Sequence, residues 1–485
     1  MIEFLIKLHP EIAIKSKSVR KRQTLLLERN LKTILLQVDS AVEVSNNYDH
    51  LTVRCDNDDP AIQQKLIDRL GCIPGVVAFA EMQSSSFSSL HDIFEQVLVV
   101  YAEQLVNKTF SVRVRRSGNH DFSSIEAERY IGGGLNQHVA SAKVQLKKPD
   151  LVVTLEIKKD LLIMVRKMHP GMGGFPLPSQ SDVLSLISGG YDSAVASYLM
   201  IRKGLRTHYL FFNLGGAAHE AGVREMAFHI WQRYSLSHKV KFVSVNFAPV
   251  VEQILEKIDN GLMGVVLKRM MMRVGSEVAQ RLGIKALVTG ESIGQVSSQT
   301  IANLNVIDRV TDTLILRPLI YQDKQEIIDM ARKIGAEDIA KSMPEYCGVI
   351  SKKPTVNAVL AEVEQTELQF DFSVLEQVIN EAKVLDIRTV EYQAEQQAHV
   401  VTELAQLPAN AIVLDIRAPE ETEDKPLTVA GHQVIEMPFF RLSSQFASLD
   451  QSQQYYCYCA RGVMSRLQAV VLQEQGFTNV AVYRP

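Results

Sequence analysis

The sequence predicts a multidomain protein with an α+β amino-terminal region, a doubly wound parallel α/β domain and a smaller α/β domain at the carboxyl end. Three observations support this prediction. The chain has 485 residues, which is enough for three or four domains that each have a core. Short apolar strands alternate with helical patterns along most of its length. The segment 169–178 is rich in glycine and proline and is typical of a linker.

The amino-terminal region shows the element order of a ferredoxin-like unit, strand-helix-strand-strand-helix-strand. The expected elements are Ile2–Leu8, a helix from Ser18 to Leu36, Val42–Val44, Leu51–Cys55, a helix that begins at Pro60, and Val76–Ala80. A second α+β group follows, with helices at Leu90–Val106 and Ser124–Ala140 and strands at Thr109–Val114, Leu151–Ile157 and Leu161–Val165. Two small α+β units are therefore expected before the linker.

After the linker, single strands and helices alternate, which is typical of a parallel sheet covered on both faces. Strands are expected at Val183–Ile187, Thr207–Phe212, Lys241–Val245 and Ala286–Thr289. Residues 360–405 are acidic and rich in glutamine, and we expect them to form a helical connector. A last α/β unit begins near Ala411, with an edge strand at His432–Met437 and a strand at Tyr455–Cys459 that leads into a helix.

The most informative motif is Ser188-Gly189-Gly190-Tyr191-Asp192-Ser193, which lies between a strand and a helix. Glycines allow positive φ angles and a close approach of the backbone to a ligand. The free N–H groups and the positive end of the helix favour phosphate, and Asp192 could hold Mg²⁺ against phosphate oxygens. The alternative is a plain turn in which Asp192 and Ser193 cap the helix. The motif matches neither the Walker loop nor the dinucleotide fingerprint.

A second motif, Cys459-Ala-Arg-Gly-Val-Met-Ser465-Arg466, also follows a strand and precedes a helix. Backbone N–H groups at a helix amino terminus stabilise a thiolate and would equally stabilise a persulfide. The alternative is a small buried side chain. A phosphatase loop requires arginine six residues after the cysteine to hold phosphate. That position is Ser465, so the spacing disfavours a phosphatase.

Basic residues gather in three clusters of the amino-terminal region, although the whole chain has a net charge of −3. Such clusters suit the phosphates of a nucleic acid, or they form an ordinary solvated face. The candidates for RNA contacts are Lys15, Lys17, Arg20, Arg113, Arg115, Arg116, Lys147 and Lys148.

Composition and the first residues predict a cytoplasmic protein without a membrane partner. No apolar run approaches the roughly 20 residues needed to span a bilayer, and the first residues lack a signal-peptide pattern. The five cysteines are scattered and without zinc spacing, which disfavours a disulfide framework or a metal cage. Cys55 and Cys72 are expected to be structural, and the role of Cys457 stays open.

The motifs Ser188–Ser193, Met343–Ile350 and Cys459–Arg466 together resemble those of the tRNA 4-thiouridine synthetase family, in its long form. The resemblance runs from end to end of the chain. It implies a ferredoxin-like domain (1–62), a THUMP RNA-binding domain (63–167), a linker (168–180), an ATP pyrophosphatase domain (181–395), a connector (396–404) and a rhodanese domain (405–485).

The resemblance also implies the residues of two sites. ATP would be bound by Leu186, Ile187, Ser188, Gly189, Gly190, Asp192, Ser193, Lys268, Gly290 and Gln299, with Asp192 and Lys324 serving activation. Cys459 would carry a persulfide in a cradle that comprises Arg461, Gly462, Ser465 and Arg466. Cys347 would resolve the intermediate through a disulfide with Cys459.

The implied reaction is sulfur transfer to tRNA. ATP, with Mg²⁺ and without a stably bound prosthetic group, would adenylate O4 of the uridine at position eight, and sulfur would replace that oxygen. The implied partners are tRNA, a cysteine desulfurase, a thiamine thiazole sulfur-carrier protein and a cellular reductant. Two alternatives stay open at this point. One is another adenylating enzyme of the pyrophosphatase class, such as a tRNA 2-thiolation, lysidine-forming or amidotransferase enzyme, and the other is a non-catalytic RNA-binding scaffold.

Overall fold

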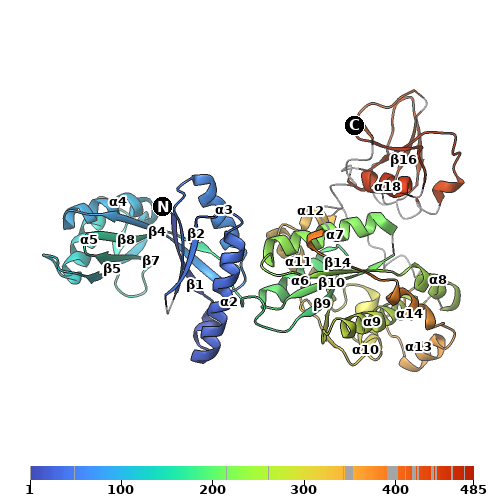
Figure 1. Cartoon of the computed structure of the whole chain (residues 1–485), viewed down its shortest axis with the longest axis horizontal. Coiled ribbons are helices and arrows are strands. Elements are labelled where there is room, and N and C mark those ends of the chain that lie inside the picture. Colours follow the sequence, from blue (N-terminus) through green and yellow to red (C-terminus); the bar gives the residue numbers. More distant parts are fainter. Residues whose placement is uncertain are drawn as a thin grey trace. The chain divides into compact units, whose positions relative to one another are not determined.

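The protein divides into two compact units in a computed structural model of the chain (Figure 1). The first unit comprises Met1–Ser179 with Arg202–Gly204, and the second comprises Gln180–Ile201 with Leu205–Pro485. The structure describes residues 2–47, 50–214, 216–259, 261–341, 343, 353–389, 402–409, 411–417, 422, 425–437, 442, 445–459, 463–474 and 476–485. Within these ranges, no helix is both long and apolar enough to cross a membrane.

The described strands of the first unit form one eight-stranded sheet with the order β2-β3-β1-β4-β8-β7-β5-β6. Its elements are β1 (Ile2–Leu8), α1 (Pro10–Ala13), α2 (Lys17–Leu35), β2 (Val42–Asn47), β3 (His50–Cys55), α3 (Pro60–Leu70), β4 (Val76–Ser86), α4 (Leu90–Leu105), β5 (Thr109–Ser117), α5 (Ser124–His138), β6 (Lys143–Val144), β7 (Leu151–Lys158) and β8 (Leu161–Pro170). The predicted ferredoxin-like order from β1 to β4 is confirmed.

The long strand β4 joins the two predicted α+β groups into a single sheet. It pairs with β1 on one side and with β8 on the other. The predicted boundary at residues 62 and 63 falls inside α3, and β4, which completes the ferredoxin-like order, lies beyond it. The sequence pattern predicted β4 only as far as Ala80, because the residues that follow in β4 are mostly polar and lack the regular apolar alternation of a strand.

The predicted linker at 168–180 is an ordered part of the first unit. Its first residues belong to β8, where Pro170 pairs with Ala78 of β4. Further along, Leu177 is fully buried, and its carbonyl accepts a 2.8 Å hydrogen bond from the Asn30 side chain on α2. The glycine and proline residues of this segment therefore lie in a packed part of the first unit and do not form a flexible linker.

In the second unit, the described strands β9 to β14 form a six-stranded sheet with the order β13-β12-β9-β10-β11-β14. Its elements are β9 (Val183–Leu186), α6 (Tyr191–Arg202), β10 (Thr207–Asn213), α7 (Gly216–Tyr234), β11 (Lys241–Asn246), α8 (Ala248–Lys257), α9 (Met263–Arg281), β12 (Ala286–Val288), η1 (Ser297–Gln299), α10 (Ile301–Asp308), β13 (Leu314–Leu316), α11 (Lys324–Lys333), α12 (Glu337–Lys341), α13 (Leu360–Glu367), α14 (Ser373–Asn380) and β14 (Lys383–Asp386). Strands β9 to β13 are parallel, as predicted, and β14 adds an antiparallel edge.

Composition predicted a connector from residue 360, but residues 360–386 pack into the α/β core, within the range 181–395 that the resemblance implies for this domain. Val363 of α13 and Val378 of α14 are buried with the side chains of α9. Arg269 of α9 is 1% exposed and forms two hydrogen bonds of 2.5 and 2.9 Å with the Glu367 carboxylate. Its remaining nitrogen donates to the Val306 carbonyl. A buried charge needs such partners, so this ion pair holds α13 against α9.

The described strands at the carboxyl end form a separate parallel sheet with the order β15-β19-β18-β16-β17. The elements are β15 (Glu403–Leu404), β16 (Ile412–Asp415), β17 (Gln433–Glu436), η2 (Phe446–Ser448), β18 (Tyr455–Tyr458), α18 (Val463–Glu474) and β19 (Val480–Tyr483). Strand β15 lies inside the predicted connector 396–404, so the carboxyl-terminal sheet begins earlier than predicted.

Loss of the buried ion pair should destabilise the second unit. We expect Glu367→Ala to lower the free energy of unfolding by about 3–5 kcal/mol, because it leaves the Arg269 charge buried without its partner. Glu364→Ala is the matched control, since Glu364 lies on the same helix and is exposed. Urea unfolding followed by circular dichroism measures both changes. Equal stability of the two variants would contradict the role given to Glu367.

Candidate functional site

The Ser188–Ser193 loop closes on itself at the carboxyl end of β9. Gly189 has φ +82°, which favours glycine, and α6 begins at Tyr191. The Ser188 N–H donates to the Ser193 Oγ at 3.2 Å, and that hydroxyl donates to the Gly190 carbonyl. The loop therefore combines a positive-φ turn with a helix amino terminus, which is the geometry that binds phosphate.

Asp192 is the meeting point of three segments of the chain. Lys324, the first residue of α11, places its Nζ 3.0 and 3.1 Å from the two carboxylate oxygens. Gln295 donates its Nε2 to Oδ2 at 2.9 Å. The loop after β12 also approaches closely, since a Cβ on Gly290 would lie 2.6 Å from the Asp192 carbonyl carbon. Glycine is therefore required at position 290.

A second group of charges surrounds Glu291, which follows Gly290. Its carboxylate accepts hydrogen bonds from Lys268 at 2.8 Å, Arg317 at 2.8 Å and Thr289 at 3.0 Å. Burial alone would raise the pKa of Glu291, but the two cations more than offset it and lower the pKa from 4.5 to about 2. Glu291 thus stays ionised and holds the Lys268 side chain at this edge of the sheet.

Most of the predicted ATP-binding residues meet at this edge. Leu186 is half-buried and Ile187 buried at the end of β9, and Gly290 touches the start of α6. Gln299 is 8% exposed, and its backbone carbonyl accepts from the Gly294 N–H. Parallel neighbours β9 and β12 explain the gathering, because their carboxyl ends share one edge.

Two residues at this loop were not predicted from the sequence. His219 of α7 is 4% exposed and hydrogen-bonds the Ser188 backbone, and burial lowers its pKa to about 4 despite that bond. Met343 lies against two glycines, since a Cβ on Gly189 or Gly222 would come within 2.8 or 2.5 Å of its side chain. Neither contact has a local sequence signal, because α7 and Met343 are far from the loop along the chain.

Cys459 lies directly after β18 and is half-buried. The Ser465 N–H donates to its sulfur at 3.3 Å, and the Ser465 hydroxyl lies 3.4 Å from the sulfur. The predicted cradle residue Arg466 is instead paired with Glu403 of β15. The Arg466 side chain is thus engaged by a carboxylate of β15, and its part in the cradle stays a prediction.

Three predicted residues, Cys347, Arg461 and Gly462, lie outside the described part of the chain. Cys457 of β18 is fully buried, and burial raises the pKa of its thiol to about 12. It is therefore a core side chain and a poor nucleophile. Cys55 is buried in β3, and Cys72 is half-buried.

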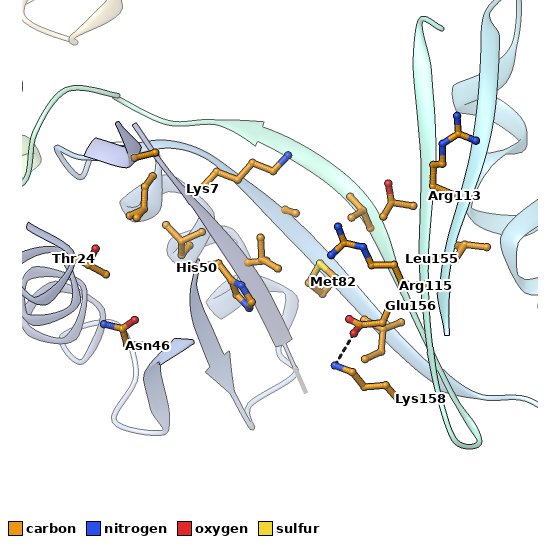
Figure 2. A pocket seen from close by; sticks show the side chains of 18 of the residues that line it. Lys7, Thr24, Asn46, His50, Met82, Arg113, Arg115, Leu155, Glu156 and Lys158 are labelled. Atoms are coloured by element: carbon orange, nitrogen blue, oxygen red, sulfur yellow. Dashed lines mark ion pairs between the residues drawn. The ribbon is translucent and has the colours of Figure 1, made fainter. Parts of the chain in front are cut away.

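A groove of about 1200 Å³ crosses the sheet of the first unit (Figure 2). Apolar side chains such as Met82, Ile163 and Val165 line it. Its charged lining consists of Lys7, Lys17, Arg20, Lys21, Arg113, Arg115 and Lys158 against Glu128 and Glu156. The excess of positive charge suits a phosphate backbone.

The groove unites two of the three predicted basic clusters. Lys17 and Arg20 come from α2, and Arg113 and Arg115 from alternate positions of β5, which face the same side of the sheet. The remaining candidates, Lys15, Arg116, Lys147 and Lys148, are not among its lining residues. Lys7 and Lys158 were missed, although each occupies an exposed position of an alternating strand.

Among the described residues, no group of three or more histidine, cysteine, aspartate or glutamate side chains is arranged to hold a metal ion. Asp192 is the one acidic residue of the Ser188–Ser193 motif. Mg²⁺ usually binds one or two carboxylates together with substrate phosphates, so a single carboxylate at this position fits such an ion.

The glycine turn at the carboxyl edge of a parallel sheet defines the second unit as an α/β domain of the phosphate-binding class. Two family descriptions match the chain, "Thiamine biosynthesis protein (ThiI)" over residues 178–372 and "THUMP domain" over residues 87–165. A tRNA sulfurtransferase of Tolumonas auensis is 59% identical over 100% of both chains. That of Colwellia psychrerythraea is 55% identical, also over 100% of both.

The chain therefore belongs to the tRNA sulfurtransferase family and is an enzyme of the sulfurtransferase class. A solved 4-thiouridine synthetase in complex with RNA and with bound ATP shares the fold, with a TM-score of 0.67 over 80% of this chain and 99% of that one. The two sequences are 23% identical.

The charge on Glu291 predicts a specific pH dependence. A carboxylate whose folded pKa lies below its unfolded pKa stabilises the fold above the unfolded value and loses this contribution as the pH falls towards the folded value. Between about pH 5.5 and pH 3.5, wild type should therefore lose about 1 kcal/mol more stability than Glu291→Gln. Urea unfolding at both pH values measures this difference, and parallel losses would refute the ionised state of Glu291.

Proposed function

We propose that this chain uses ATP to activate O4 of the uridine at position eight of tRNA and replaces that oxygen with sulfur, giving 4-thiouridine. The observation that carries the proposal is the set of charged side chains around the Ser188–Ser193 loop, with Asp192 held by Lys324 and Lys268 held by Glu291. The names of the relatives and the ligands of the structure with the same fold agree with it.

The loop binds the phosphates of ATP. Its backbone N–H groups and the amino terminus of α6 face the negative charge, while Lys268 and Lys324 supply cations for the departing pyrophosphate. Leu186, Ile187, Gly290 and Gln299 surround the nucleoside. Mg²⁺, when bound with ATP beside Asp192, supplies further neutralisation of the phosphate charge.

Activation turns a poor leaving group into a good one. The uridine O4 attacks the α-phosphorus, the bond to the β-phosphate oxygen breaks, and pyrophosphate leaves. The adenylated O4 can then depart as AMP when sulfur attacks C4. The positively charged side chains act on the charge that develops during the first step, where preorganised groups accelerate reactions most.

Cys459 delivers the sulfur from the carboxyl-terminal sheet, which we take to be a rhodanese domain. A cysteine desulfurase loads the persulfide, and the Ser465 N–H stabilises its negative charge, as it contacts the thiol. The terminal persulfide sulfur attacks C4 and AMP leaves, or the Cys347 thiolate first attacks the Cys459 sulfur, which forms the Cys347–Cys459 disulfide and releases hydrosulfide, and the hydrosulfide attacks C4. In the first case, Cys347 attacks the Cys459 sulfur, which yields 4-thiouridine and a Cys347–Cys459 disulfide. A reductant returns two electrons to the disulfide.

The contact of Met343 supports the role of Cys347. Met343 touches Gly189 of the loop, and Cys347 follows four residues later. Met343 is thus the described residue nearest to Cys347 along the chain, and it lies at the nucleotide loop.

The basic groove of the first unit binds tRNA. Its lysines and arginines contact phosphates, and its apolar lining faces the sugar and base surfaces of a structured RNA. The same sulfur supply would serve a thiamine thiazole carrier protein, whose adenylated carboxyl terminus takes the place of the uridine. We expect this reaction to take place in the cytoplasm, where cysteine thiols are kept reduced.

Replacement of the sulfur-carrying residue tests the main proposal. With tRNA, ATP, cysteine and a desulfurase, mass spectrometry of the nucleosides should show 4-thiouridine for wild type and for the control Cys72→Ser. Cys459→Ser should lower its formation by about 10³-fold or more, since the sulfur nucleophile is lost, while pyrophosphate is still released as the adenylated uridine forms. Unmodified uridine with wild type would exclude this function, and full 4-thiouridine formation by Cys459→Ser would exclude Cys459 as the sulfur carrier.

The salt dependence of tRNA binding tests the groove. The slope of log K against log salt concentration is negative, and each lost phosphate contact reduces its magnitude by about one. The double variant Arg113→Gln/Arg115→Gln should therefore bind tRNA more weakly, with a slope whose magnitude is smaller by about two. Lys147→Gln/Lys148→Gln removes the same charge outside the groove and should leave the slope unchanged. Equal slopes for the two double variants would exclude the groove as the binding surface.

A further inference from the structure

Gln295 makes a contact with Asp192 that the sequence motifs do not assign to any role. Its amide nitrogen lies 2.9 Å from Asp192 Oδ2, and its Oε1 is buried without a hydrogen-bond partner among the described residues. The orientation of the amide follows from this contact, because the reverse orientation would set an oxygen against a carboxylate. The hydrogen bond to Asp192 is therefore the one well-placed hydrogen bond that the Gln295 side chain makes among the described residues.

The turn that carries Gln295 is fixed to the segment that carries Lys324. The Ile293 N–H donates to the Ile320 carbonyl at 3.0 Å, and the Ser292 hydroxyl donates to the Gln322 carbonyl at 2.8 Å. Gln295 and Lys324 thus contact Asp192 from two segments that are hydrogen-bonded to each other. Both segments therefore hold the Asp192 carboxylate.

The two contacts on Asp192 constrain it differently. Lys324 Nζ lies 3.0 and 3.1 Å from the two oxygens, so this flexible point charge tolerates rotation of the carboxylate. The planar amide of Gln295 contacts Oδ2 alone. Oδ2 thereby receives two N–H donors and Oδ1 one, which leaves Oδ1 with more lone-pair capacity for another partner.

We propose that Gln295 is a positioning residue of the activation step, which fixes the rotation of the Asp192 carboxylate and turns Oδ1 towards the nucleotide. When Lys324 shifts towards a phosphate, Gln295 is the contact that keeps Asp192 in place. This inference rests on the proposed function, since it assigns Gln295 a role in forming the adenylated uridine.

The variant Gln295→Met keeps the length of the side chain and removes the donor. In full-length enzyme with tRNA, ATP, cysteine and a desulfurase, we expect the kcat of AMP formation to fall about 10- to 100-fold, the effect of one hydrogen bond to a charged group. The KM for ATP should change less than about twofold. Gln325→Met is the matched control, because Gln325 makes the same kind of bond to exposed Asp329, and it should behave as wild type.

A double-mutant cycle separates this role from a merely structural one. In an Asp192→Asn background, Gln295→Met should cost less than about twofold, because its effect passes through Asp192. An equal cost in both backgrounds, or a raised KM with unchanged kcat, would overturn the inference.

A crystal structure of Gln295→Met tests the inference even if wild type forms no AMP, an outcome that would count against the proposed function alone. The Asp192 carboxylate should be rotated or spread over two orientations in the variant. A carboxylate in the same single orientation as in wild type would overturn the role of Gln295.

Discussion

The parallel pairing of β9 with β12 is the constraint on which the nucleotide site depends. Leu184 pairs with Leu287 in this ladder, so the loops that follow the two strands meet at one edge of the sheet. Their approach is so close that position 290 has no room for a Cβ beside Asp192. The glycine turn, Asp192 in the first turn of α6 and the loop from Thr289 to Gln299 are therefore assembled by backbone packing, before any ligand binds.

Charge balance is the second property of this edge. Lys324 lies on Asp192, and Lys268 lies on Glu291. Each lysine is thus held by a carboxylate, and Arg317 shares Glu291 while it also contacts Asp308. In the proposed reaction, ATP would exchange these contacts for its own, which would limit the electrostatic gain on binding and leave the lysines to stabilise the charge that develops on the phosphates.

Local patterns were sufficient to predict most of the elements and both chemical motifs. Alternation and turn residues located β1, β3, β7 and β9 to β11 within about two residues, because their apolar faces are buried in regular order. The pattern failed where tertiary packing decides the outcome. Residues 360–386 were expected to form a connector, yet the Arg269–Glu367 ion pair and the edge strand β14 integrate them into the core.

The candidate sites show the same division. The loop residues and Cys459 could be named from the sequence because their chemistry follows from consecutive residues. The contacts of His219, Met343 and Gln295 could not, since each depends on a segment that is distant along the chain. Likewise, the charge pattern indicated the basic clusters, but only the sheet decided which of them share a groove.

Isotope transfer gives the most direct test that ATP activates the uridine oxygen. A tRNA that carries ¹⁸O at O4 of the uridine at position eight would be incubated with the enzyme, ATP, cysteine and a desulfurase, and the AMP would be analysed by mass spectrometry. Adenylation at O4 predicts one ¹⁸O atom in AMP for each 4-thiouridine formed. Recovery of the ¹⁸O in water or pyrophosphate, with unlabelled AMP, would contradict the account.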